Sequence, residues 1–179
     1  MARLTVRDWP PYSRTDQTRR DNAVLAAKLM MNAAFTAPVT GGIPQVEGEI
    51  VYGEEEQEEI ARKIEDLAYE RKVWRHIFLY EAEMVREADV ILFLGNTRAH
   101  RTPFNSECGA CGGRPDCSFF YDRHSHKRGI VDVTADRKAN RKLVPGPLCA
   151  TYVHNTGYLV GSALMVAVRL YVDARPFMS

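Results

Sequence analysis

The sequence has no apolar run long enough to cross a membrane. Its most apolar stretch is VILFLG, residues 90–95, which is far shorter than the roughly 20 residues that a membrane helix needs. The first 20 residues also lack the apolar core of a secretory signal. We therefore expect a soluble, cytoplasmic protein with no membrane partner.

An excess of charge of either sign is also lacking. The 24 basic and 23 acidic residues leave a net charge of +1, whereas a dedicated nucleic-acid-binding protein usually has a strong basic excess. The sequence shows no internal repeat, no paired carboxylates and no Ser–His–Asp arrangement that would mark catalytic residues. We expect no nucleic-acid partner, and the catalytic residues stay unknown.

Cysteine is scarce, but its placement is uneven. Three of the four cysteines lie within residues 108–120, CGACGGRPDCSFF, and the spacing of all four is C-x2-C-x5-C-x31-C. In a reducing cytosol this pattern favours metal binding or catalysis over disulfides. Four thiolates are the set that a [4Fe–4S] cluster requires, and the glycines after Cys108 and Cys111 permit a tight loop.

Two other interpretations of the thiols stay open. Structural zinc usually takes two close pairs of ligands, and this sequence has one close pair, so zinc is the second hypothesis and free thiols or a redox pair the third. His124 and His126 are candidate metal ligands in a basic stretch that is more typical of a solvated loop. His154 follows Cys149 by five residues and would lie near a cluster or form an ordinary helix hydrogen bond. His76 and His100 belong to no pattern.

Hydrophobic periodicity predicts an α/β protein: a single layered domain with a central sheet flanked by helices and a cysteine-rich iron–sulfur loop. Residues 1–20 are expected to form an N-terminal arm, and 21–179 the domain, with the cluster segment at 108–149. Predicted helices cover 21–37, 54–68, 80–88 and 148–171. Predicted strands cover 47–53, 73–78 and 89–96, and the last of these is expected to be central, with both faces covered.

Two helical patterns predict additional packing. The helix 21–37 is apolar around nearly its whole circumference and is expected to be buried on nearly every side. Gly157 and Gly161 lie four residues apart on one helix face, which indicates the close approach of another helix or a ligand. Together these surfaces predict a homodimer.

The cysteine segment CGACGGRPDCSFF resembles the four-iron ferredoxin-like modules of several anaerobic redox proteins. The chain from about Asn22 onward resembles a family of uncharacterised anaerobe proteins that contain a ferredoxin domain, through EADVILFLGN, GPLCATYVHNTGYLVGSAL and VDARPFM. The resemblance implies that the cluster ligands are Cys108, Cys111, Cys117 and Cys149. This sequence has five residues between Cys111 and Cys117, where the family pattern usually has four, so Cys117 is the ligand most in question.

A fainter resemblance links NAAFTAPVTGGIPQ, ADVILFLGN and GYLVGSALMVAVRLYVD to nitroreductase-like flavoproteins. It implies a flavin mononucleotide (FMN) site in which Gln45 supplies an amide contact. The arginine-bearing phosphate motif of those proteins has no clear counterpart here, and Arg14, Arg19 and Arg20 are candidates by position.

These observations lead to three functional hypotheses. The first is electron transfer through one [4Fe–4S] cluster, as a small oxidoreductase or an accessory subunit that serves a redox partner protein or a small-molecule acceptor. The second is a flavin-dependent oxidoreductase in which the cluster feeds electrons to FMN. The third is a zinc-stabilised interaction module without redox chemistry.

Overall fold

The computed structural model describes residues 17–40, 46–96 and 149–177. These residues combine α-helices with one antiparallel pair of strands, so the expected mixture of helix and strand is confirmed. In chain order the elements are α1 (Gln17–Phe35), β1 (Val46–Val51), α2 (Glu54–Glu70), the short 3-10 helix η2 (Lys72–Trp74), α3 (Arg75–Glu87), β2 (Ile91–Asn96) and α6 (Ala150–Arg169).

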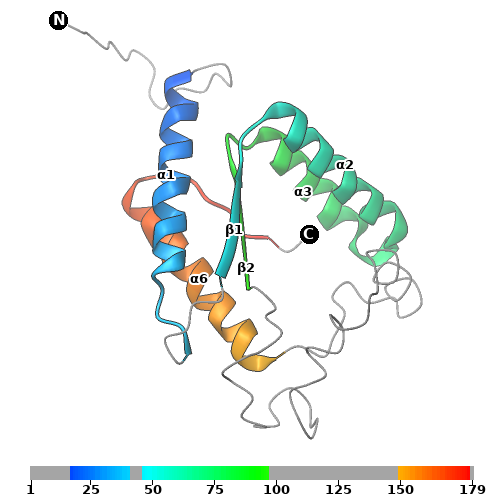
Figure 1. Cartoon of the computed structure of the whole chain (residues 1–179). Helices are drawn as coiled ribbons and strands as arrows, with labels where there is room; N and C mark the ends of the chain where they lie inside the picture. The colour runs from blue at the N-terminus through cyan, green and yellow to red at the C-terminus, as the bar shows by residue number, and fades with distance from the viewer. Residues whose placement is uncertain (1–16, 41–45, 97–148, 178–179) are drawn as a thin grey trace, which may run out of the picture.

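Two helix pairs lie on opposite sides of the two strands (Figure 1). The first pair is the α2–α3 hairpin, and its core consists of Ala61, Ile64, Ala68, Phe78, Ala82 and Val85. The second pair is α1 with α6, and its core consists of Met30, Ala34, Leu159, Ala163 and Ala167. Strand β2 joins the two cores, because Ile91 packs against the first while Leu92 and Leu94 pack against the second.

The strands form a ribbon in which Val46 lies opposite Asn96 and Val51 lies opposite Ile91. One face of the ribbon packs on the α1–α6 pair. Gly48 allows this close contact, because a Cβ there would lie 2.5 Å from the sulfur of Met31. On the other face Phe93 is 43% exposed, beside the exposed Glu47 and Glu49. A central sheet flanked by helices, with both faces covered, is therefore not confirmed within the described residues.

Helix α1 is buried along one side only, which corrects the expectation of burial on nearly every side. Ala26, Ala27 and Ala34 face the core, whereas Leu25 and Leu29 are exposed. The reason is that α6 and the strands contact α1 from the same side. The helix also begins at Gln17, so the last four residues of the expected arm at 1–20 are helical and the rest lie outside the described residues.

The predicted strand at 73–78 is wrong, because these residues form η2 and the first turn of α3. Phe78, Ala82 and Val85 are buried at helical spacing against α2. The short apolar stretch VWRHIF is compatible with either structure when it is taken alone. The spacing that continues beyond residue 78 makes the helix the better solution.

The predicted last helix at 148–171 is confirmed to within two residues by α6. Its buried face repeats every four residues, at Asn155, Leu159, Ala163 and Ala167. The expected close approach at Gly157 and Gly161 is wrong within the described part of the chain, since no atom there lies within 4 Å of a Cβ built on either glycine.

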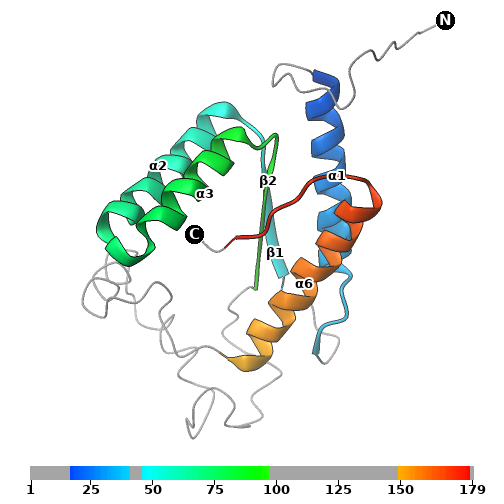
Figure 2. The same ribbon diagram turned by 180° about the vertical axis from the view of Figure 1, so that it is seen from behind.

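After α6 the chain reverses direction. Tyr171 adopts a positive φ of 57°, and the N–H of Val172 donates to the carbonyl of Ala167 at 3.0 Å. The tail then runs back across the strands toward α3 (Figure 2). Its Arg175 lies within electrostatic range of Tyr80 on α3.

Candidate metal centre

Cys149 is the candidate ligand that the structure describes. It is the N-cap residue of α6, with extended backbone (φ −68°, ψ 123°), and its carbonyl accepts a hydrogen bond from the N–H of Val153 at 3.1 Å. The side chain is half-buried and forms no disulfide. A thiol in this position is held in place by the helix start and keeps one side accessible to a ligand.

The start of α6 suits a negatively charged group. The first N–H groups of an α-helix have no partner within the helix, and the helix dipole adds partial positive charge at the same end. Both effects stabilise an anionic group that is bound at this end of the helix, such as an iron–sulfur cluster. The donor type and its setting at Cys149 therefore fit an iron–sulfur cluster or zinc.

The end of β2 and the start of α6 lie at the same end of the molecule (Figures 1 and 2). The chain leaves the described strand at Asn96 and re-enters at Cys149. Cys108, Cys111 and Cys117 belong to the sequence between these points, and they lie outside the described residues, as do His100, His124, His126, Arg14 and Gln45.

Asn155 is a structural residue near this end that the sequence interpretation did not identify. It is 3% exposed, and its Oδ1 accepts hydrogen bonds from the backbone N–H and the hydroxyl of Thr40, at 3.1 and 3.0 Å. These bonds fix the turn that follows α1 against α6. The sequence did contain a sign of this role, because Asn155 is a polar residue on the same helix face as the apolar positions 159, 163 and 167. A polar side chain that is buried on such a face is normally hydrogen-bonded.

The two described helix histidines are exposed. The ring of His154 packs against Tyr158 in the next turn of α6, with ring centroids 4.5 Å apart. An exposed ring in contact with Tyr158 differs from the hydrogen-bonded helix histidine that was the ordinary expectation for His154. His76 lies in the first turn of α3.

Arg19 and Arg20, the candidates for a flavin phosphate, are engaged in ion pairs. Arg19 Nε contacts Asp89 Oδ2 at 2.7 Å and Arg20 Nη2 contacts Glu54 Oε1 at 2.7 Å. These pairs connect the first turn of α1 to the first residue of α2, Glu54, and to Asp89, which follows the end of α3. At 1.5 Å per residue, Arg20 is about 22 Å along α1 from Phe35, which precedes the turn held by Asn155.

The largest polar cluster in the described residues connects α2 to α3. Arg86 contacts Glu58, Glu65 and Glu83 at 2.8, 2.7 and 2.9 Å. The hydrogen bonds from Arg86 and then Arg62 lower the pKa of Glu58 to about 2, and those from Glu65 and Glu58 raise the pKa of Arg86. All of these carboxylates are occupied by a guanidinium, so the cluster is structural.

The acidic run EEEQEE begins α2, as expected for a solvated helix start. Its glutamates are exposed or half-exposed, whereas Gln57 is 4% exposed. The amide of Gln57 donates to the carbonyls of Val85 and Ala88, at 3.0 and 2.7 Å, and so provides hydrogen-bond donors for carbonyl groups at the C-terminal end of α3.

In the parts of the chain that the structure covers, no three His, Cys, Asp or Glu side chains are grouped so that they could hold a metal ion. None of the helices described is both long and apolar enough to traverse a bilayer.

Comparison with known proteins identifies one clear relative. A protein of Archaeoglobus fulgidus, described as an uncharacterized protein, is 34% identical over 158 residues, which cover 88% of this chain and 74% of the relative. No family model and no solved structure matches the chain. Identity at this level over most of both chains shows common descent, so the chain belongs to the same family as the archaeal protein.

Proposed function

We propose that the protein is an electron carrier that binds one [4Fe–4S] cluster through Cys108, Cys111, Cys117 and Cys149. The observation that supports this most directly is the position of Cys149. A free, half-buried thiol begins α6 at the end of the molecule where the chain leaves β2 toward the three clustered cysteines. Cys149 is remote in sequence from the other three cysteines, and the shared location of the end of β2 and the start of α6 supports its inclusion in the proposed ligand set.

The chemistry supplied by such a cluster is one-electron transfer. The contribution of this chain is to hold the Cys149 thiolate and to offer helix N–H groups and dipole at the start of α6. We propose that the electron is passed to a redox partner protein or to a small-molecule acceptor, in the reducing conditions of the cytoplasm.

The deciding experiment is purification without oxygen, followed by absorption spectroscopy and by iron, sulfide and zinc analysis. We expect a brown protein with a broad absorption shoulder and about four iron and four sulfide per chain. A colourless protein with one zinc per chain would instead support the interaction module. Protein that binds neither metal would overturn both hypotheses.

The flavin hypothesis is the second candidate, because Asn155 does bring the APVT turn against the last helix. However, Arg19 and Arg20 are paired with carboxylates near the opposite end of α1. A flavin whose ring lay at the APVT turn would therefore need another phosphate ligand. Titration of the anaerobic protein with FMN, followed by flavin fluorescence, tests this candidate, and the variant Arg20→Gln tests the predicted phosphate contact separately.

A further inference from the structure

The ribbon of two strands has an open edge along β1. Among the described residues β1 pairs with β2 and with no other strand. The tail after α6 crosses on the β2 side of the ribbon (Figure 2), and no described element lies beyond β1 on the opposite side (Figure 1). The backbone N–H and C=O groups on this edge of β1 can therefore accept a further strand.

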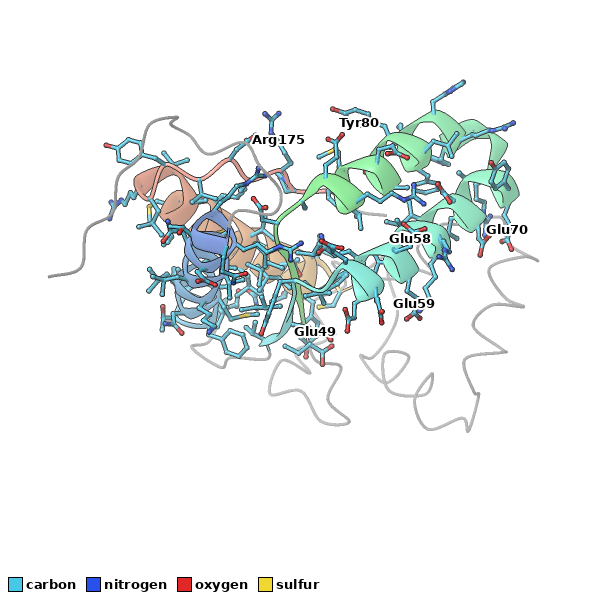
Figure 3. All side chains as sticks on the ribbon, turned by 90° about the horizontal axis from the view of Figure 1, so that it is seen from above. Glu49, Glu58, Glu59, Glu70, Tyr80 and Arg175 are labelled. Carbon is cyan, nitrogen blue, oxygen red and sulfur yellow. The ribbon has the colours of Figure 1, made fainter. Side chains whose placement is uncertain are left out.

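The outer face of the ribbon beside this edge is both acidic and apolar. Glu47 and Glu49 are exposed, and Phe93, which lies opposite Glu49, is 43% exposed. Figure 3 shows Glu49 pointing away from the helices. Within the residues that the structure describes, neither glutamate forms an ion pair. This face suits a strand that brings apolar side chains together with positive charge.

Charge is divided unevenly between two segments of the chain. Residues 46–96 contain 14 acidic and 6 basic side chains, whereas residues 97–148 contain 5 acidic and 10 basic ones. The basic residues of the second segment stand on both sides of the apolar run IVDV, residues 130–133. Lys127 and Arg128 precede this run, and Arg137 and Lys138 follow it. A β-branched run with basic flanks has the composition that the edge of β1 requires.

The connections on either side of this run are long enough to reach β1. The chain leaves the described ribbon at Asn96 and re-enters at Cys149, at the same end of the molecule. The run starts 34 residues after Asn96 and ends 16 residues before Cys149. Even the shorter connection spans about 50 Å when it is extended, and a strand of six residues is about 20 Å long.

We propose that residues 128–134, which lie outside the described residues, pair with the open edge of β1 as a third strand. Side chains alternate between the two faces of a strand. Val131 and Val133 then lie on the face of the ribbon from which Val46 packs against α1 and α6. Arg128 lies on the outer face with Glu47 and Glu49 and forms an opposite-charge pair with one of them.

The opposite alternation is excluded by the same residues. It would direct Arg128 and Asp132 toward the apolar core of α1 and α6, and a charge buried without a partner is costly. The proposed strand uses no cysteine, so it does not depend on the proposed cluster. It would attach to the sheet the part of the chain that links Cys117 to Cys149.

Hydrogen exchange of the full chain, purified without oxygen, tests the proposal. We expect the amides of residues 130–133 and of β1 to be protected, independently of protein concentration. Glu49→Arg and Arg128→Glu are each expected to lower the protection of residues 130–133 by about three- to tenfold, because a cross-strand charge pair is lost. The double variant restores an opposite-charge pair and is expected to recover most of the loss.

Asp66→Lys is the matched control, because it makes the same change of charge at an exposed carboxylate on α2, away from the ribbon. It should leave the protection of residues 130–133 unchanged. Circular dichroism of every variant checks that the fold is retained. Iron is measured on the same samples, so that loss of the cluster and loss of the third strand are read separately.

Three results would overturn the proposal. The first is exchange of residues 130–133 at the rate of an unfolded chain. The second is protection of these residues that neither single variant lowers, or that the double variant does not recover, since their partner would then lie elsewhere. The third is protection of β1 that rises with protein concentration while residues 130–133 stay unprotected, because the edge would then be occupied by a second copy of the chain.

Discussion

At the scale of single residues, Cys149 provides the sharpest test of the proposed cluster. Serine is a good helix N-cap, so Cys149→Ser keeps the start of α6 while it removes the thiolate. We expect this variant to lose most of its iron and sulfide, to nearly the same extent as Cys108→Ser. Electron paramagnetic resonance of oxidised and reduced samples distinguishes full loss from conversion to a three-iron cluster.

The control for this experiment is the thermal stability of Cys149→Ser relative to the iron-free wild-type protein, which we expect to be unchanged. A variant that keeps four iron per chain and an unchanged spectrum would show that Cys149 is an ordinary helix-capping thiol. The fourth ligand would then have to be sought elsewhere, first at His124 and His126.

Asn155 supports a second prediction at the residue scale. Asn155→Ala removes the acceptor of both hydrogen bonds from Thr40 and is expected to lower the free energy of unfolding by about 1 to 3 kcal/mol. Thr40→Ala, which removes only the hydroxyl donor, should have a smaller effect. Urea unfolding measures both, and the double variant should be less destabilised than the sum of the two single variants. If Asn155→Ala is as stable as wild type, the turn after α1 is held by other contacts.

At the scale of elements, the cluster around Arg86 makes the α2–α3 hairpin sensitive to acid. The pKa of Glu58 falls from its usual 4.5 to about 2 on folding, and that of Glu65 is also lowered. A carboxyl whose pKa is lowered in the folded state stabilises the fold fully above its unfolded pKa. This stabilisation is lost as the pH falls from about 4.5 through 2.

We therefore expect Arg86→Met to destabilise the protein at pH 7 and to differ progressively less from wild type as the pH falls below 4.5. Urea unfolding at a series of pH values measures the difference. Lys63→Met is the matched control, because the exposed pair of Lys63 with Glu59 contributes little to stability. A difference between Arg86→Met and wild type that is constant from pH 7 to pH 2.5 would contradict this account.

The sequence predicted most of these elements because their apolar spacing was long enough to distinguish helix from strand. Helices α1, α2 and α6 and strands β1 and β2 were all expected near their observed bounds. The stretch 73–78 was assigned wrongly because six residues hold fewer than two helical turns. The partners of each element were less predictable, since the exposure of Leu25 or Phe93 depends on which side the neighbouring elements occupy.

At the scale of the whole molecule, the two cores should unfold with some independence. The α2–α3 core and the α1–α6 core meet mainly through β2. Phe78→Ala in the first core and Leu159→Ala in the second are each expected to cost about 2 to 5 kcal/mol. Hydrogen exchange should then accelerate mainly in the helix pair that contains the substitution. Equal acceleration throughout α1, α2, α3 and α6 in both variants would show instead a single cooperative unit.

The candidate site was predictable only in its chemistry. The spacing of four cysteines suggested the type of ligand set, and the predicted helix at 148–171 placed Cys149 at a helix start, which is confirmed. The role of Asn155 was not predicted, because its hydrogen-bond partner is Thr40, which is 115 residues away in sequence. The pairing of Arg19 and Arg20 with acidic residues was missed for the same reason.

The packing of α1 against α6 also affects how the chain is synthesised. Ala34 and Leu159 belong to the same core, but Leu159 lies about 125 positions later in the chain. At ordinary rates of translation it therefore leaves the ribosome roughly 6 to 25 s after Ala34. The contacts between α2 and α3 are local in sequence, so this hairpin closes early. During the delay the apolar side of α1 has no α6 to cover it. Until α6 emerges, this apolar side of the first helix is therefore a site at which the nascent chain can aggregate or bind a chaperone.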